Sequence, residues 1–251
     1  TDLPESSAMV QVNNSWWLLN DSGDGPYLYE VHPETGELQR KITITQADNV
    51  DWESMTQDSS YIYIGDTGNN KGKRQDLRLF RISKADLDST LTKIPAQTIA
   101  YHYPEQQHFD GRPHPFDCEG IVTDSSFIYL FTKNRNNSNS YLYRIPNQPG
   151  EYAAERIDSF AVQGMITDAI WDAKAGRLSL LGYNIEDAFF PFIWEWEGLE
   201  HPGFPPNGKR RDLYPEIQAE AMTILNDSAL LINSEAGTAS RHQLFTWRRR
   251  Q

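Results

Sequence analysis

The sequence predicts an all-β protein: a five-bladed β-propeller built from four-stranded antiparallel blades. Three observations predict this fold. A strand–turn–strand pattern recurs five times, an aromatic strand follows each recurrence, and helical periodicity is nearly absent. Aromatic residues make up 12% of the chain, and 16 Gly and 14 Pro separate the short apolar runs, as is typical of strands and turns. Only residues 84–91 have the pattern of a short helix.

The recurring unit begins near residues 7, 53, 119, 168 and 220. Its five copies read SAMVQVNNSWWLLND, ESMTQDSSYIYIGD, EGIVTDSSFIYLFT, DAIWDAKAGRLSLLGY and EAMTILNDSALLINS. Third strands are expected at residues 27–31, 79–82, 141–145, 192–196 and 243–247, and more polar fourth strands at 38–44, 98–103 and 155–162. Four antiparallel strands per unit make a propeller blade, so we expect residues 1–251 to form a single propeller domain.

Two features of the ring stay open at this point. A six-bladed ring would need a further unit within residues 83–118, where a Pro-rich insertion lies at 104–116 and no suitable hairpin is visible. The fifth copy ends after its third strand, so its outer strand is either missing or supplied by the few residues before Ser7.

Composition excludes several classes of function. The net charge of −12 argues against a broad nucleic-acid interface, which needs a basic face. No apolar run is long enough to span a membrane, and the mean hydropathy is −0.64. The single cysteine, Cys118, excludes an intrachain disulfide. G-x-S-x-G, P-loop and H-E-x-x-H motifs are all missing, so serine hydrolase, nucleotide-loop and zinc-protease chemistry lack their residues.

The first residue of each unit is expected to lie at one mouth of the central channel, because the first strand of a blade lines the axis. A small residue and then an apolar one follow it in every unit. Four carboxylates that converge there would repel each other unless they take up protons or bind a cation. An all-oxygen ligand set favours Ca²⁺, with Mg²⁺ second. The predicted metal ligands are Ser7, Glu53, Glu119, Asp168 and Glu220. The alternative is that these acids are solvated loop residues.

The loops that leave this mouth are rich in Gly and Asn and carry basic residues. We expect them to bind a small-molecule or anionic ligand. The predicted ligand-binding residues are Asp21, Asn69, Asn184 and Glu235. The basic residues on the same loops are Lys71, Lys73, Arg74, Lys133, Arg135 and Arg241. The alternative is that these basic residues only keep the hairpin tips soluble.

Several motifs resemble those of a known group of proteins. The runs NDSGDGPYLYEV, VDWESM, YIYIGDTGNN, FDCEGI and YLFTK resemble bacterial, usually exported propeller proteins that include phytase-like and esterase-like members. The resemblance spans residues 16–145 and implies an extracellular or periplasmic protein whose signal peptide has been removed or trimmed. The pattern of one acid per blade is similar to the calcium-dependent apyrase family, although a counterpart of the apyrase nucleotide loops is missing.

Three functions fit these observations. The first is a monomeric, calcium-stabilised scaffold that binds its ligand through the loops, and this is the function we expect. The second is a metal-dependent hydrolase of phosphate esters or nucleotides, in which Asp66 or Asp51 activates water and Lys133 or Arg135 stabilises developing charge. The third, a glycosidase, would need two carboxylates about 5–9.5 Å apart in an open cleft, and a bound ion would occupy them.

Overall fold

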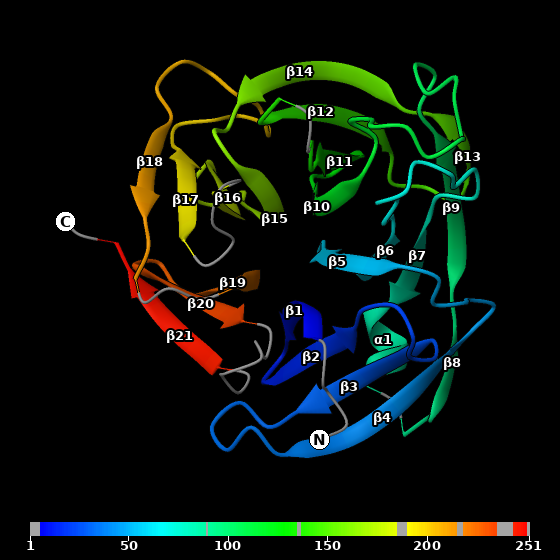
Figure 1. Ribbon diagram of the computed structural model, residues 1–251. Helices are drawn as coiled ribbons and strands as arrows, with labels where there is room; N and C mark the ends of the chain where they lie inside the picture. Colours follow the sequence, from blue (N-terminus) through cyan, green and yellow to red (C-terminus); the bar gives the residue numbers. More distant parts are fainter. Residues whose placement is uncertain are drawn as a thin grey trace.

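The strands form five sheets around a central axis, which confirms the five-bladed propeller (Figure 1). The computed structural model describes residues 6–88, 90–134, 137–184, 190–214, 218–234 and 243–249. Within these ranges the helical content is α1 (Lys84–Leu87), the short helix expected from the sequence. No helix of the described chain is long and apolar enough to cross a membrane.

Each blade starts at the axis and runs outward in chain order. Blade 1 contains β1 (Ser6–Val12), β2 (Ser15–Asn20), β3 (Tyr27–Val31) and β4 (Leu38–Thr45). Blade 2 contains β5 (Trp52–Gln57), β6 (Tyr61–Asp66), β7 (Arg78–Ser83) and β9 (Gln97–His102). Blade 3 contains β10 (Cys118–Thr123), β11 (Phe127–Thr132), β12 (Asn139–Pro146) and β14 (Glu155–Ala161). Blade 4 contains β15 (Met165–Asp172), β16 (Arg177–Tyr183), β17 (Pro191–Trp196) and β18 (Lys209–Asp212). Blade 5 contains β19 (Ala219–Asn226), β20 (Ala229–Ser234) and β21 (Gln243–Arg248).

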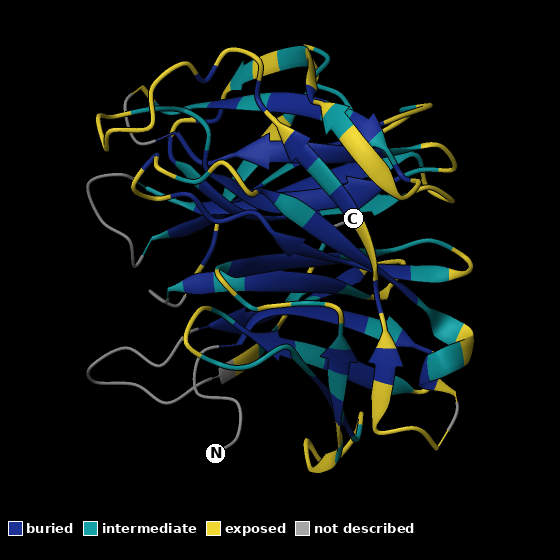
Figure 2. Cartoon of the chain, turned by 90° about the vertical axis from the view of Figure 1, so that its right-hand side faces the viewer, coloured by how far each residue is buried: buried dark blue, intermediate teal, exposed yellow. Residues whose placement is uncertain are grey.

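The hydrophobic core lies between the blades. Side chains on a strand alternate between the two faces of its sheet, so each blade can bury apolar residues against both neighbours. Five apolar clusters result, one at each junction between neighbouring blades. In the side view the buried residues lie along the strands, and the exposed ones gather in the loops (Figure 2). The ring is therefore stabilised by packing between blades rather than by one central core.

Connections between third and fourth strands reach back to the preceding blade. Strand β8 (Lys93–Pro95) pairs in parallel with β4 of blade 1, and β13 (Gly150–Ala153) pairs in parallel with β9 of blade 2. In blade 4 the corresponding connection places the Phe204 ring against Phe160, and the Phe204 N–H donates to Asp158 (3.1 Å). Strands β8 and β13 pair with the outer edges of blades 1 and 2, which would otherwise present unpaired backbone groups, and the blade-4 connection packs on the outer strand of blade 3 through side chains.

The six-bladed alternative is wrong. Residues 83–118 contain α1, β8 and β9 but no additional blade. The ring closes where β1 contacts β19, and Asn233 Nδ2 donates to the Ser6 carbonyl (2.8 Å). Blade 5 has three strands in the described chain, and residues 1–5, the candidates for a fourth, lie outside it.

A β-bulge near the start of the first strand recurs in every blade. Pairing with the second strand skips one residue in each case: Ser7, Glu53, Glu119, Thr167 and Glu220. A bulge adds an unpaired residue and re-aims its side chain, so it breaks the simple alternation of faces. The five first strands also contact one another in a closed ring, which brings the bulges together near the axis.

Candidate functional site

The bulges correct one member of the predicted ring. In blade 4 the bulged residue is Thr167, and Asp168 occupies the next position, which is taken by Ala8, Ser54, Gly120 and Ala221 in the other blades. The Thr167 hydroxyl donates to the Ala219 carbonyl of blade 5 (3.0 Å), just as the Ser7 hydroxyl donates to the Trp52 carbonyl of blade 2 (2.9 Å). The ring position therefore carries two hydroxyls and three glutamates, and the hydroxyls join neighbouring blades.

Asp168 lies between blades 4 and 5 instead. It is 5% exposed, and its carboxylate accepts hydrogen bonds from the backbone N–H groups of Ala169 and Met222 (2.7 Å each). Burial is the largest cause that raises the pKa of Asp168, to about 8, while the two N–H donors act in the opposite direction. The alignment that placed Asp168 with the glutamates failed because a bulge shifts the register by one residue without altering the apolar pattern.

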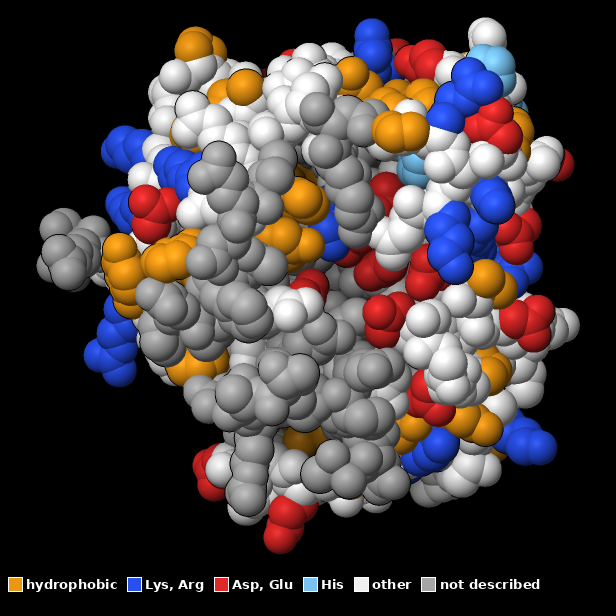
Figure 3. All heavy atoms as spheres, viewed as in Figure 1, with side chains coloured by type: hydrophobic (Ala, Val, Ile, Leu, Met, Phe, Trp, Pro, Cys, Tyr) orange, Lys and Arg blue, Asp and Glu red, His pale blue; other side chains and the backbone are white. Residues whose placement is uncertain are grey.

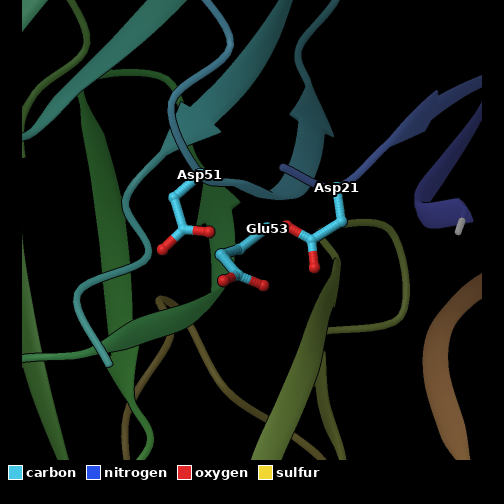
Figure 4. A group of neighbouring side chains, drawn as sticks. All are labelled: Asp21, Asp51 and Glu53. Carbon is cyan, nitrogen blue, oxygen red and sulfur yellow. The ribbon is translucent and has the colours of Figure 1, made fainter. Parts of the chain in front are cut away.

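Three carboxylates do converge, and they come from blades 1 and 2 rather than from all five. Asp21 follows β2, Asp51 precedes β5, and Glu53 is the bulged residue of β5. One ligand oxygen from each lies within 4.8 Å of the other two. Figure 4 shows the three side chains turned toward one another. The sequence predicted a different role for each of these residues, and the fold brings them into one cluster, which we call the blade-2 acid cluster.

Asp66 holds Asp51 in place. The Asp66 side chain is fully buried, and it accepts a hydrogen bond from the Asp51 backbone N–H (2.9 Å). The guanidinium groups of Arg74 and Arg78 pair with the two Asp66 oxygens at 3.1 and 3.0 Å. Asp66 is thus a charge-paired structural residue at the end of β6. Its predicted role as the base that activates water is untested, and a fully buried carboxylate has no exposed surface from which to do so.

Two further residues shape the blade-2 acid cluster, and sequence reasoning did not single out either of them. The Asn49 amide donates to the carbonyls of Asn20 (3.1 Å) and Asp21 (2.9 Å), so it ties the loop after β2 to the start of β5. Gly68 lies directly behind the carboxylates. A Cβ atom at this position would lie 2.3 Å from Asp51 Oδ2 and 2.5 Å from Glu53 Oε1. Only glycine leaves room for both acids here.

The electrostatics of the blade-2 acid cluster are unfavourable for the charged carboxylates. Burial, followed by the nearby Glu119, Asp21, Asp117 and Asp51 carboxylates, raises the pKa of Glu53 well above its usual value. Burial and then Asp21 and Asp117 raise the pKa of Asp51 to about 6. Glu53 is 8% exposed, and within the described chain no hydrogen bond or ion pair reaches its carboxylate. An uncompensated buried carboxylate is destabilising, so the cluster favours a proton or a cation.

Blade 3 contains a second pair of acids that is already neutralised in part. Glu119 Oε2 lies 3.1 Å from Lys133 Nζ, and both side chains are almost completely buried. Asp117 Oδ1 accepts a hydrogen bond from the Asn69 backbone N–H (2.7 Å). The Lys133 ammonium also lies 5.3 Å from the centre of the Tyr183 ring. Lys133 therefore compensates charge inside the protein, and its predicted role in stabilising a transition state stays a prediction.

The remaining predicted residues are distributed around these clusters. Glu220 is half-buried and accepts a hydrogen bond from Gln218 (2.9 Å). The Asn69 side chain joins Phe116 and Arg74, and the Asn184 side chain accepts a hydrogen bond from Arg210, so both amides make contacts within the fold. Arg135 and Glu235 lie outside the described residues. Their ligand-binding or catalytic roles stay predictions.

The view along the axis shows where these groups lie on the surface. Acidic side chains gather beside a hollow near the middle of this face, and most of the Lys and Arg side chains lie farther out (Figure 3). Asp21 and Asp51 are half-buried, so the blade-2 acid cluster is open to solvent on one side. Cys118 is fully buried and burial raises the pKa of its thiol, so it has neither the access nor the thiolate of a nucleophile.

Comparison with known proteins identifies no family. No family model matches the chain, and no curated protein matches its sequence. Similar solved structures include hydrazine synthase of Kuenenia stuttgartiensis (11% identity, TM-score 0.45, covering 92% of this chain and 74% of that one). A chain of the mitotic checkpoint complex is also similar (9% identity, TM-score 0.45, covering 100% of this chain and 90% of that one). So is a functionally unknown protein from Desulfotomaculum acetoxidans (10% identity, TM-score 0.47, covering 98% of this chain and 76% of that one). At these scores the likenesses carry no argument, and the fold assignment rests on the strand pairing of this chain.

Proposed function

We propose that this protein is a calcium-binding β-propeller that binds one exchangeable ion between Asp21, Asp51 and Glu53. The observation that carries the proposal is the Glu53 carboxylate: nine-tenths buried, directed at two other carboxylates, and reached by no hydrogen bond or ion pair from the described chain. A divalent cation would convert this repulsion into attraction, and the half-exposed side of the cluster gives an ion a route in from solvent.

The all-oxygen ligand set and its irregular geometry favour calcium over magnesium. Ca²⁺ binds oxygens at about 2.3–2.6 Å, so two oxygens on opposite sides of one ion lie about 4.6–5.2 Å apart. For Mg²⁺ the corresponding separation is about 4.0–4.2 Å. The oxygens of the blade-2 acid cluster all lie within 4.8 Å of one another, a spacing that Ca²⁺ coordination can span, whereas Mg²⁺ needs a near-ideal octahedron of ligands. Backbone carbonyls or water would complete the coordination.

Chemistry of the surroundings favours a binding scaffold over a hydrolase. In the hydrolase alternative Asp66 or Asp51 would activate water, but Asp66 is fully buried between two arginines and Asp51 belongs to the proposed ion site. Of the two residues predicted to stabilise charge, Lys133 is already paired with Glu119, and Arg135 lies outside the described residues. An ion on the open side of the cluster could instead take an oxygen-bearing or anionic group of a small ligand as an additional ligand. We propose this role for the channel mouth, in an extracellular or periplasmic protein.

Calcium titration of the purified protein tests the proposal. Isothermal titration calorimetry after EDTA treatment is expected to give one site for Ca²⁺ and weaker binding of Mg²⁺. Glu53→Gln is expected to abolish Ca²⁺ binding, because it removes the most buried ligand. Glu37→Gln, at an exposed position of the loop before β4, is the matched control and should bind as the wild type does. Wild-type protein that binds no Ca²⁺ would contradict the proposal.

A panel of substrates separates the scaffold from the hydrolase. Hydrolysis of nucleotides, phytate and p-nitrophenyl phosphate by the purified protein is measured in calcium and in EDTA. We expect no calcium-dependent turnover. Turnover that disappears in Asp51→Asn but not in Glu37→Gln would instead support the hydrolase.

A further inference from the structure

Blades 2 and 3 begin with the same acidic triplet. Asp51-Trp52-Glu53 and Asp117-Cys118-Glu119 both place an acid before the first strand and a glutamate at the bulge. The middle residue is fully buried in both, and it pairs with the last residue of the second strand. The two first strands, β5 and β10, contact each other, so the two triplets lie next to each other. The mouth of the channel thus contains two copies of one acidic arrangement, side by side.

The residue that faces each pair of acids differs. In blade 2 the Gly68 N–H donates to the Asp51 carbonyl (3.2 Å), and in blade 3 the Lys133 N–H donates to the Asp117 carbonyl (2.7 Å). The two residues therefore make the same backbone contact to the acid that starts each triplet, although Gly68 lies one residue later in the strand register than Lys133, whose register equivalent is Thr67. A Cβ at Gly68 would point into the Asp51 and Glu53 carboxylates, and the Lys133 side chain does extend to Glu119. Thr67 directs its hydroxyl to the Cys118 carbonyl (2.8 Å), so blade 2 places no ammonium group beside its acids, whereas blade 3 does.

We propose that Asp117 and Glu119 form a second cation position, which the Lys133 ammonium fills permanently. The inference rests on the proposed function of the blade-2 acid cluster, because it treats that cluster as the open copy of the same site. The channel mouth then presents one exchangeable cation and one tethered cation next to each other. Removing the ammonium opens the second position to a divalent cation.

Burial and charge support this assignment. The Lys133 side chain is 7% exposed and the Glu119 side chain 5%, so neither charge is compensated by bulk water. Asp117 is 1% exposed, and one of its oxygens bonds to the Asn69 N–H, which orients the carboxylate. The Glu119 carboxylate beside the ammonium, together with the Asp117 carboxylate two residues before it, offers the hard oxygen ligands that Ca²⁺ also prefers. A tethered cation explains how the protein can fold without two ions at adjacent sites.

The test counts bound calcium ions in three variants. Lys133→Ala removes the ammonium, and the expected Ca²⁺ stoichiometry rises from one to two per chain. Lys133→Arg keeps a cation and is expected to keep a stoichiometry of one. Lys133→Ala/Glu119→Gln removes the ammonium together with its acid, and it should also return the stoichiometry to one. Calorimetry and equilibrium dialysis with ⁴⁵Ca²⁺ supply the counts.

The outcomes separate this inference from the proposed function. One ion in the wild type and one in Lys133→Ala would overturn the second position and leave the first intact. No ion in the wild type but one in Lys133→Ala would contradict the proposed function and support the second position. No ion in either protein would contradict both. Should Lys133→Ala unfold in EDTA, calcium must restore its circular dichroism spectrum; failure at every calcium concentration would overturn the inference.

Discussion

Blades 2 and 3 have the same turn between their first and second strands. They differ at the opposite ends of these two strands, which lie at the channel mouth. Asp58 in blade 2 caps its hairpin turn through two N–H groups and accepts a hydrogen bond from Tyr63 (2.7 Å). Asp124 in blade 3 makes the same contacts with its own turn and with Tyr129 (2.7 Å). At the opposite end of these strands, blade 3 compensates its glutamate with Lys133, while blade 2 leaves Glu53 among acids.

This difference shows how a repeated scaffold can acquire a site. The hairpin contacts are the same in both blades, so the presence of Lys133 in blade 3 and of Thr67 and Gly68 in blade 2 changes the electrostatics next to the acids without changing the fold. Blade 3 pairs its glutamate with a lysine of the same chain, whereas Glu53 of blade 2 lies among other acids. The following predictions compare the two blades, beginning with the largest expected effect.

The same substitution should have opposite effects on the stability of the calcium-free protein in the two blades. Glu119→Gln leaves the buried Lys133 ammonium without its charge partner and is expected to cost roughly 3 kcal/mol. Glu53→Gln removes an uncompensated buried charge and is expected to raise the melting temperature. Thermal unfolding in EDTA at pH 7.5 measures both. Equal destabilisation by the two variants would show that Glu53 has a charge partner after all.

Calcium should stabilise the wild type through blade 2 alone. At about 100 times the dissociation constant, a bound ion adds about 2.7 kcal/mol, which corresponds to a rise in Tm of roughly 5–10 °C for a chain of this size. The rise should disappear in Glu53→Gln and persist in Glu37→Gln. A rise of the same size in Glu53→Gln would place the ion elsewhere.

Gly68→Ala should disturb the blade-2 acid cluster by crowding. Its Cβ would lie 2.3 Å from Asp51 Oδ2, so the carboxylates must separate. Overpacking of this kind costs about 1–3 kcal/mol, and we expect calcium affinity to fall at least tenfold. Gly203→Ala is the matched control, because a Cβ there meets no atom within 4 Å. Unchanged calcium affinity in Gly68→Ala would mean that the ion does not bind these two acids.

Asp168→Asn should leave calcium affinity within about twofold of the wild type, because Asp168 lies between blades 4 and 5. The variant replaces one acceptor of a backbone N–H by an amide NH₂, so stability should fall by about 1–3 kcal/mol. Calorimetry and thermal unfolding measure the two effects. Loss of calcium binding in this variant would show that Asp168 is a metal ligand.

The pH dependence of the calcium-free protein should follow Asp51 and Glu53. Both have a higher pKa in the folded than in the unfolded chain, so the folded state binds their protons more tightly. These two groups therefore stabilise the fold as the pH falls from 7.5 through 6, and this contribution is lost as the pH rises again. The difference in Tm between wild type and Glu53→Gln in EDTA should narrow across this range. A constant difference would contradict the raised pKa of Glu53.

The sequence was sufficient to predict the blades because their strands repeat in length and apolar pattern. It also pointed to Glu53 and Glu119, since each starts a unit within the same acidic triplet. The register of blade 4 could not be predicted, because a bulge adds one residue without disturbing the apolar residues around it, and Thr167 rather than Asp168 took the ring position. The cluster itself depends on a loop: Asn49 holds Asp21 beside β5, and no periodic signal marks that contact.

The role of Gly68 could not be predicted from sequence motifs either. Glycine in the run GDTGNN is typical of a turn, and its φ is not in the left-handed region, so its role is to leave space for two carboxylates. Lys133, in contrast, was noticed for its charge but assigned to a ligand. Only the distance to Glu119 shows that the charge is used within the protein.

A crystal structure of the protein grown in calcium, with anomalous data collected to locate the ion, tests the central claim most directly. We predict one anomalous peak at about 2.3–2.6 Å from oxygens of Asp21, Asp51 and Glu53, with Lys133 still on Glu119. A map in which these three carboxylates hold no ion at saturating calcium, or in which the peak lies at another blade, would contradict it.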